Sequence, residues 1–255
     1  KLFMKPETHI FDNATLAAHA VALLMQELAI AKQQQNQMLN IAVSGGSTPK
    51  QFFTLLAEDD YRTQIPWEAV RFFWVDERCV EPAHPESNFG MTYDALLQYA
   101  FVPAQNIFRM KGEDIPANEA VRYANLLWKE LPAKNGFPVF DLILLGIGDD
   151  GHTASIFPDN MELLESEKSV EVATHPVSGQ KRITLTGKTI NNANRVIFLV
   201  TGKNKSGIIS EIVNGASEAE KYPAAYILPA SRKLISDRAS TAQRTSATIL
   251  PSFDQ

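Results

Sequence analysis

Glycine and hydroxyl-bearing residues follow an apolar stretch near the start of the chain, over residues 44–49 (SGGSTP). Glycine lets backbone N–H groups approach an anion, the hydroxyls donate hydrogen bonds, and the N-terminus of a following helix adds a favourable dipole. The pattern therefore favours a phosphate site, although an ordinary helix cap followed by proline explains residues 47–49 equally well. The candidate phosphate-binding residues here are Ser44, Gly45, Gly46, Ser47 and Thr48.

A histidine within GIGDDGHT, residues 146–153, is the candidate general base. Asp150 precedes His152 by two residues, and a nearby carboxylate orients an imidazole and makes it more basic. A histidine in a turn is more often an ordinary polar residue, which is the interpretation given to the other histidines. The segment also matches the dinucleotide-binding pattern G-x-G-x-x-G. However, its two adjacent carboxylates would repel a pyrophosphate, and the short stretch before Pro158 is a poor start for the helix that this pattern needs. Dinucleotide binding is therefore rejected.

Four further charged residues lie at the ends of apolar strands. Asp76 and Arg78 follow the apolar residues 71–75, Lys205 follows another apolar strand, and Arg182 opens a third. Lys205 and Arg182 could contact a phosphate, and Asp76 and Arg78 could act on a polar substrate. The commoner roles are a salt-bridged turn for the first pair and solvated surface side chains for the other two.

Several familiar site types are missing from the sequence. Residues 187–189 (GKT) look like the end of the nucleotide-binding pattern G-x-x-x-x-G-K-[ST], but Arg182 stands where the first glycine of that pattern should be. The segment is therefore not a nucleotide-binding loop. There is no G-x-S-x-G elbow and no HExxH helix, which argues against the usual serine and zinc hydrolases. The single cysteine, Cys79, cannot form an internal disulfide and is interpreted as structural.

Composition narrows the class of protein further. The 255 residues include 24 Lys and Arg against 29 Asp and Glu, a formal net charge of −5, which disfavours nucleic-acid binding. Uninterrupted apolar runs are shorter than the roughly 18 residues of a membrane span. Residues 1–6 lack the apolar region of a signal peptide. We therefore expect a soluble, cytoplasmic protein that binds neither nucleic acid nor membrane.

Amphipathic helical segments alternate with short apolar strands along the chain. Helices are predicted over residues 15–31, after Pro49, from a cap at Ser87 or Asn88, and over residues 118–131 and 205–213. Strands are predicted over residues 39–43, 71–75, 140–145, 170–174, 182–186, 195–200 and 234–236, with a polar, irregular tail after residue 241. This alternation predicts one α/β domain over residues 1–255, with a mostly parallel sheet, helices on both faces and ligands beyond the carboxyl ends of the strands.

Four segments together resemble the 6-phosphogluconolactonases of the glucosamine-6-phosphate isomerase/6-phosphogluconolactonase family. They read IAVSGGSTP, FFWVDERCV followed by HPESNFGM, FDLILLGIGDDGHTASIFP, and KRITLT with FLVTGKNK, and the resemblance runs in order over residues 8–237. It implies the three-layer α/β fold shared with glucosamine-6-phosphate deaminases and ribose-5-phosphate isomerases. The implied reaction is hydrolysis of 6-phospho-D-glucono-1,5-lactone to 6-phosphogluconate in the oxidative pentose phosphate pathway.

Hydrolysis of a lactone, an activated ester, needs a base for water and a proton for the leaving ring oxygen, and we hypothesise the following roles for the candidate residues. His152 takes a proton from water and returns it to the ring oxygen, while Asp150 holds the imidazole. The phosphate lies on residues 44–48 and Lys205, with Arg182 as a further contact. Arg78 stabilises the oxyanion or shares the phosphate, and Asp76 binds sugar hydroxyls or orients Arg78. No metal or cofactor is expected, and the protein is expected to be a monomer or a small homo-oligomer.

Three rival functions fit these residues less well than lactone hydrolysis does. A non-catalytic sugar-phosphate sensor would not need His152 and Asp150 as a base pair. In the deaminase pattern a glutamate stands five residues after the turn histidine, where this chain has Phe157, so deamination or isomerisation lacks a group. A dehydrogenase using the GIGDDG turn ranks last.

Overall fold

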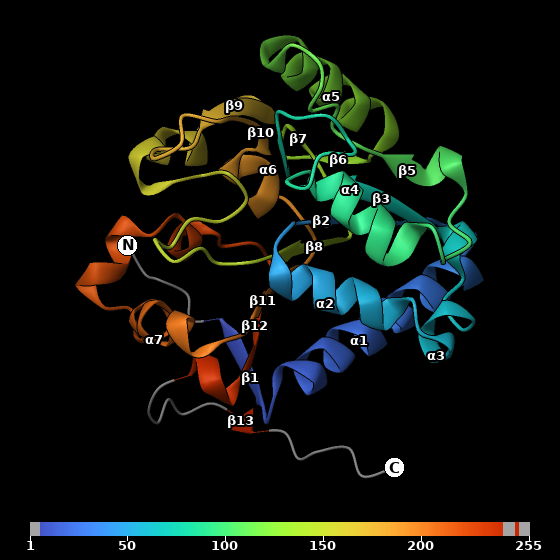
Figure 1. Ribbon diagram of the computed structural model, residues 1–255, viewed down its shortest axis with the longest axis horizontal. Coiled ribbons are helices and arrows are strands. Elements are labelled where there is room, and N and C mark those ends of the chain that lie inside the picture. Colours follow the sequence, from blue (N-terminus) through green and yellow to red (C-terminus); the bar gives the residue numbers. More distant parts are fainter. Residues whose placement is uncertain (1–5, 242–247, 250–255) are drawn as a thin grey trace.

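Parallel strands form the central sheet of the computed structural model, which describes residues 6–241 and 248–249 (Figure 1). The sheet has eight strands in the order β13-β1-β12-β11-β8-β2-β3-β5, and every neighbouring pair is parallel. The strands are β1 (Glu7–Phe11), β2 (Leu39–Val43), β3 (Val70–Trp74), β5 (Ile107–Phe108), β8 (Leu142–Leu145), β11 (Val196–Val200), β12 (Arg232–Asp237) and β13 (Thr248–Ile249).

Helices cover both faces of this sheet, which confirms the predicted three-layer α/β fold. They are α1 (Ala14–Gln34), α2 (Ser47–Leu56), α3 (Asp59–Arg62), α4 (Asn88–Thr92), α5 (Pro116–Glu130), α6 (Gly187–Asn191) and α7 (Ser206–Asn214). One buried core contains apolar residues of α5 and α7, and the other contains apolar residues of α1 and α2. Alternate residues of β2 and β8 enter opposite cores, as the strand geometry requires.

Shorter elements complete the chain. Short 3₁₀ segments lie at Trp67–Ala69, Ala104–Asn106, Pro158–Leu164, Lys203–Lys205, Ser217–Lys221, Pro223–Tyr226 and Arg238–Ser240, and a π-helical turn lies at Tyr93–Leu97. Strands β6 (Ala133–Lys134) and β7 (Phe137–Pro138) form a small hairpin.

Helix α1 is long and apolar enough, by length and composition, to cross a membrane. Asn13 begins it by accepting a hydrogen bond from the backbone N–H of Leu16. Its buried side chains belong to the core shared with α2 and the sheet, and they are Ala17, Ala18, Val21, Ala22, Met25 and Ala29. The small alanines allow the helix to lie close to the strands, so its apolar character serves the core.

A second, antiparallel sheet corrects two of the predictions. It consists of β4 (Asp76–Arg78), β10 (Lys181–Leu185) and β9 (Val170–Thr174), in that order. The strands predicted at 170–174 and 182–186 therefore exist, but they lie outside the central sheet. The connection between β9 and β10 is too short for the crossover that parallel pairing needs, so the two strands form a hairpin. Residues 76–78, expected as a loop, form the third strand.

Two other differences concern the edge of the central sheet. The sequence pattern did not predict β1, because its residues pass from one exposed through two half-buried to two buried positions and make no apolar run. The tail after residue 241 was expected to be irregular, yet the backbone of residues 248–249 pairs in parallel with β1. Residues 242–247 and 250–255, also in that predicted tail, lie outside the described residues.

The direction of the chain reverses between β2 and β8, which are neighbours in the sheet. After β2 the chain adds β3 and β5 on one side, and after β8 it adds β11 and β12 on the other. Loops leaving the carboxyl ends of β2 and β8 therefore diverge and open a crevice between them. The topology thus places the segments 44–49 and 146–153 on either side of one crevice.

Candidate active site

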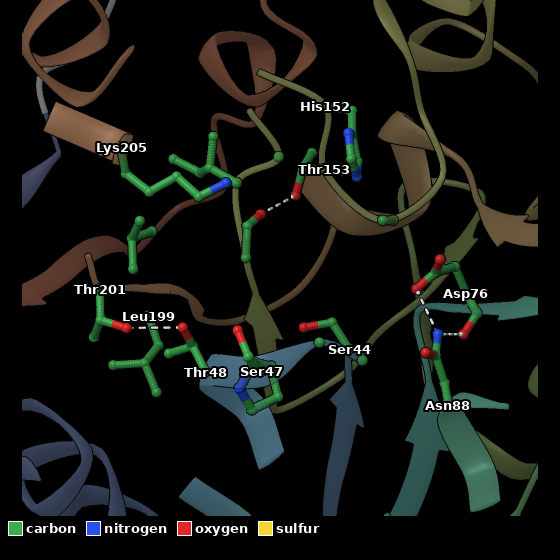
Figure 2. A pocket seen from close by; sticks show the side chains of 18 of the residues that line it. Ser44, Ser47, Thr48, Asp76, Asn88, His152, Thr153, Leu199, Thr201 and Lys205 are labelled. Atoms are coloured by element: carbon green, nitrogen blue, oxygen red, sulfur yellow. Dashed lines mark hydrogen bonds between the residues drawn. The ribbon is translucent and has the colours of Figure 1, made fainter. Parts of the chain in front are cut away.

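A cavity of about 210 Å³ lies in this crevice. Every predicted site residue except Asp150 lines it, namely Ser44, Gly45, Gly46, Ser47, Thr48, Asp76, Arg78, His152, Arg182 and Lys205. Figure 2 shows Lys205, Ser47 and Thr48 on one side and His152, Asp76 and Asn88 on the other. Hydroxyl and ammonium groups thus face one part of the cavity, and the imidazole and a carboxylate face the other.

The loop after β2 leads directly into α2, whose helix begins at Ser47, two residues before Pro49. The N-cap is Gly46, with φ +111°, and no side chain caps the helix. Ser47 and Thr48 are therefore part of the first turn, and the structure lacks the side-chain cap that was the alternative explanation of this segment. Uncapped N–H groups at a helix N-terminus are suited to an anion.

Two contacts fix the shape of this loop. A Cβ atom at Gly45 would lie 1.7 Å from Oδ1 of Asn88, so only glycine fits there without displacing Asn88. The hydroxyl of Thr48 lies 2.8 Å from that of Thr201, which follows β11. The Ser44 hydroxyl is buried and has no hydrogen-bond partner within the described residues, so it is available to a ligand.

The imidazole of His152 is held by Asp150, as predicted. Its Nδ1 lies 2.6 Å from Oδ1 of Asp150, and the same oxygen accepts the backbone N–H of His152 at 3.0 Å. Burial favours a higher pKa for Asp150, but the hydrogen bonds from His152 outweigh it and lower that pKa to about 2. Asp150 stays ionised at neutral pH and contacts Nδ1, and Nε2 has no hydrogen-bond partner among the residues that the structure describes.

Aromatic rings and a glycine limit the positions that this imidazole can take. The ring of Phe157 is fully buried, with its centroid 4.8 Å from that of His152 and 5.1 Å from that of His175. A Cβ atom at Gly148 would lie 2.1 Å from Nδ1 of His152. The turn therefore needs glycine at this position to admit the imidazole.

Asp76 lies in a buried polar network that the sequence analysis missed. Only 4% of Asp76 is exposed, and its Oδ2 accepts the hydroxyl of Ser155 at 2.6 Å. Its Oδ1 accepts Nδ2 of Asn88 at 3.3 Å. Ser155 belongs to the turn that carries His152, so this network joins that turn to β4. Asn88 and Ser155 stand within the segments of family resemblance, but Asn88 was considered only as a helix cap.

Arg78 and Arg182 face each other across β4 and β10. Arg78 donates from Nη1 to the carbonyl of Glu86 at 2.7 Å, and the Nε atoms of both arginines are buried without an acceptor. Within the described ranges neither guanidinium forms an ion pair. Burial, and then the charge of Arg78, lower the pKa of Arg182. Two neighbouring cations without a carboxylate partner make this wall of the cavity attractive to an anion.

Glu77, between Asp76 and Arg78, points away from the cavity. Its carboxylate accepts the backbone N–H groups of Arg78, Asn88 and Phe89 and the hydroxyl of Ser87. It therefore anchors the start of α4. Burial raises the pKa of Glu77, against these hydrogen bonds. Its role in the structure is to support the cavity wall.

Lys205 lines the cavity at the end of the 3₁₀ turn before α7. Its ammonium forms an ion pair with Asp149, and Nδ2 of Asn204 donates to the same carboxylate oxygen at 2.8 Å. No role for Asp149 was predicted from the sequence. Among the residues that the structure describes, no group of three or more His, Cys, Asp or Glu side chains could hold a metal ion.

Known proteins resemble this chain over most of its length. The sequence model for glucosamine-6-phosphate isomerases/6-phosphogluconolactonase matches residues 12–236. The 6-phosphogluconolactonase of Treponema pallidum is 41% identical over 206 residues, which are 81% of this chain and 83% of that protein. The 6-phosphogluconolactonase of Haemophilus influenzae is 44% identical over 211 residues, 83% of this chain and 88% of that protein.

A solved structure resembles the fold equally well. The crystal structure of 6-phosphogluconolactonase from Leishmania guyanensis superposes with a TM-score of 0.82 at 28% identity. The match covers 93% of this chain and 98% of that one. The arrangement of layers and the crevice at β2 and β8 therefore belong to an architecture that experiment has described in a similar protein.

Proposed function

The chain belongs to the glucosamine-6-phosphate isomerase/6-phosphogluconolactonase family. We propose that it hydrolyses its lactone substrate with His152 as the base that activates a water molecule. That reaction is the hydrolysis of 6-phospho-D-glucono-1,5-lactone to 6-phospho-D-gluconate, a step of the oxidative pentose phosphate pathway. The observation that carries the proposal is the 2.6 Å contact between Nδ1 of His152 and Asp150. It leaves Nε2 to accept a proton from water at the cavity.

Each chemical step has a donor and an acceptor in this scheme. Nε2 of His152 takes a proton from water, and the oxygen of the resulting hydroxide forms a bond to the lactone carbonyl carbon. The tetrahedral intermediate then collapses, and the bond between that carbon and the ring oxygen breaks. The imidazolium returns its proton to the departing ring oxygen, which becomes a hydroxyl group. The new carboxylic acid releases its proton to solvent.

Positive charge near the histidine would stabilise the tetrahedral oxyanion. The ring of Phe157 contacts both His152 and the guanidinium of Arg182, whose Cζ lies 5.8 Å from the ring centroid. Arg78 stands opposite Arg182 on the neighbouring strand. This arrangement supports an oxyanion role for Arg78, with Arg182 beside it; the alternative role of Arg182 as a phosphate contact remains a prediction.

The phosphate would lie at the other side of the cavity. The uncapped start of α2, the hydroxyls of Ser47 and Thr48, and the ammonium of Lys205 all face this part. Holding the phosphate there would direct the distant lactone carbonyl toward His152, so binding energy serves to position the reacting atoms. Ser155 and Asn88 each donate to one carboxylate oxygen of Asp76. Because an ionised carboxylate can accept about four hydrogen bonds and Asp76 lines the cavity, it is suited to accept further hydrogen bonds from sugar hydroxyls.

A coupled assay tests this proposal directly. Glucose-6-phosphate dehydrogenase generates the lactone in situ, and release of 6-phosphogluconate is followed with wild type, with His152→Asn and without enzyme. We expect the variant to lose roughly 10²- to 10⁴-fold in kcat with a smaller change in KM. Near-full turnover by the variant would exclude His152 as the base. Glucosamine 6-phosphate serves as the control substrate, and its turnover would favour the deaminase chemistry instead.

Three properties stay predictions from the sequence. They are a cytoplasmic location, a monomeric or small homo-oligomeric state, and the absence of nucleic-acid and membrane partners.

A further inference from the structure

The ion pair between Lys205 and Asp149 joins the phosphate side of the cavity to the turn that carries the base. Lys205 has 17% of its side chain exposed and lines the cavity, whereas Asp149 has 76% of its side chain exposed and lies outside it. Asp149 directly precedes Asp150. Adjacent carboxylates in one turn therefore contact the two groups that the proposed reaction uses at opposite ends of the substrate, the imidazole of His152 and the ammonium of Lys205.

Asp149 engages the same ammonium that a bound phosphate would use. Among the described residues Asp149 is the sole carboxylate that pairs with Lys205. The hydrogen bond from Lys205 keeps the pKa of Asp149 below its usual range, so the carboxylate is negative at every pH at which a phosphate ester is a dianion. A negative group beside the phosphate side weakens the attraction of Lys205 for a second anion.

We propose that Asp149 sets the affinity of the site for phosphomonoesters: by sharing Lys205 with the ligand, it weakens binding of the phosphorylated substrate and product. The inference rests on the proposed function in one respect, namely that Lys205 binds the phosphate. Asp149 has no part in the bond-breaking steps. Its effect is on ligand affinity, and it acts through Lys205.

The substitution Asp149→Asn isolates the charge. The amide oxygen can still accept the hydrogen bond from Asn204, so the geometry of the turn is retained while the negative charge is lost. An ion pair this exposed contributes little to any equilibrium, about 0.2–1 kcal/mol in similar pairs, which corresponds to a change of roughly 1.4- to fivefold. We expect 6-phosphogluconate and inorganic phosphate to bind about 1.4- to fivefold more tightly to this variant.

Calorimetry on the 255-residue chain measures these affinities without catalysis. The set comprises wild type, Asp149→Asn, Lys205→Ala, the double variant, and Asp60→Asn, which removes an equal charge from the exposed surface of α3. In the Lys205→Ala background the Asp149→Asn substitution should lose its effect. The gain in affinity should also shrink in about 1 M salt, where the Debye length is about 3 Å. KM should fall with the product dissociation constant.

The outcomes separate this inference from the proposed function. Unchanged phosphate affinity in Lys205→Ala would overturn the phosphate role of Lys205, and the inference would fall with it. If Lys205→Ala weakens binding but Asp149→Asn leaves it unchanged, or alters it no more than Asp60→Asn does, only the inference fails. Weaker binding by Asp149→Asn would likewise overturn it, because Asp149 would then be needed to aim Lys205.

Discussion

Asp149 and Asp150 are adjacent carboxylates that contact different partners and so have different proposed roles. Both are aspartates in one turn, yet Asp150 contacts the imidazole of His152 and Asp149 contacts the ammonium of Lys205. Hydrogen bonds from a histidine and from a lysine lower the pKa of both groups. In the proposed mechanism, the first contact orients a base and the second moderates an anion site.

The low pKa of Asp150 predicts how acid affects stability. Its pKa is about 2 in the folded protein against an ordinary 3.8, so its ionised form stabilises the fold fully above about pH 4. That contribution is lost as the pH falls through 2. Denaturant unfolding of wild type between pH 2 and 6 should show the loss, and Asp150→Asn should show a shallower dependence on pH. Asp60→Asn provides the control, and identical slopes for wild type and Asp150→Asn would contradict the argument.

The turn over residues 146–156 acts as one element, because its parts are fixed at both ends. The hydroxyl of Thr153 donates to the carbonyl of Gly146 at 3.0 Å, and Ser155 donates to Asp76 on β4. Gly151, with φ +82°, packs closely against Tyr222. The imidazole of His152 is therefore positioned by a turn that is tied to both sheets.

Gly148 is the point at which one added methyl group would act directly on the imidazole of His152. In Gly148→Ala the new Cβ would collide with the ring of His152, and the ring must leave Asp150. Since a side chain can rotate away, we expect the fold to survive while kcat falls by about as much as in His152→Asn, roughly 10²-fold or more. Activity and thermal unfolding are measured together.

Gly207→Ala is the matched control for that substitution, because a Cβ atom at Gly207 meets nothing within 4 Å and the residue lies in α7, away from the cavity lining. It should keep both activity and stability. Full activity in Gly148→Ala would show that the imidazole does not need its observed position.

At the scale of the whole molecule, the site depends on the three layers. The loops that form the cavity leave β2, β8 and β11, whose residues are buried between helices on both faces. Helix α1 packs on one face of the central sheet. By length and hydropathy alone it could be either a core helix or a membrane span.

Two substitutions on α1 distinguish these interpretations. Met25 is fully buried, so Met25→Ala should lower the free energy of unfolding by about 2–5 kcal/mol. Leu23 is 42% exposed, and Leu23→Ala should change it by about 0.5 kcal/mol. Chemical denaturation measures both. Equal effects, or a larger effect at Leu23, would mean that α1 does not pack as described.

The layers themselves were accessible from the sequence. The alternation of helical and strand patterns predicted the sheet, and the strand of residues 39–43 was placed without error. The prediction failed where strand partners depend on connection length or weak patterns, as for β1 and the separate sheet of β4, β9 and β10. Apolar periodicity reports how one segment is buried, and it carries little information about which strand lies beside it.

The sequence by itself determined which reactive groups are present: a glycine-rich loop, a histidine beside a carboxylate, and cations at strand ends, because these signals are local. Only the tertiary structure decided how they combine. Arg78 meets Arg182, Ser155 meets Asp76, and Lys205 meets Asp149. Each of these pairs joins segments far apart in the chain, and their contact depends on strand register and loop path, which the spacing of residues along one segment cannot specify.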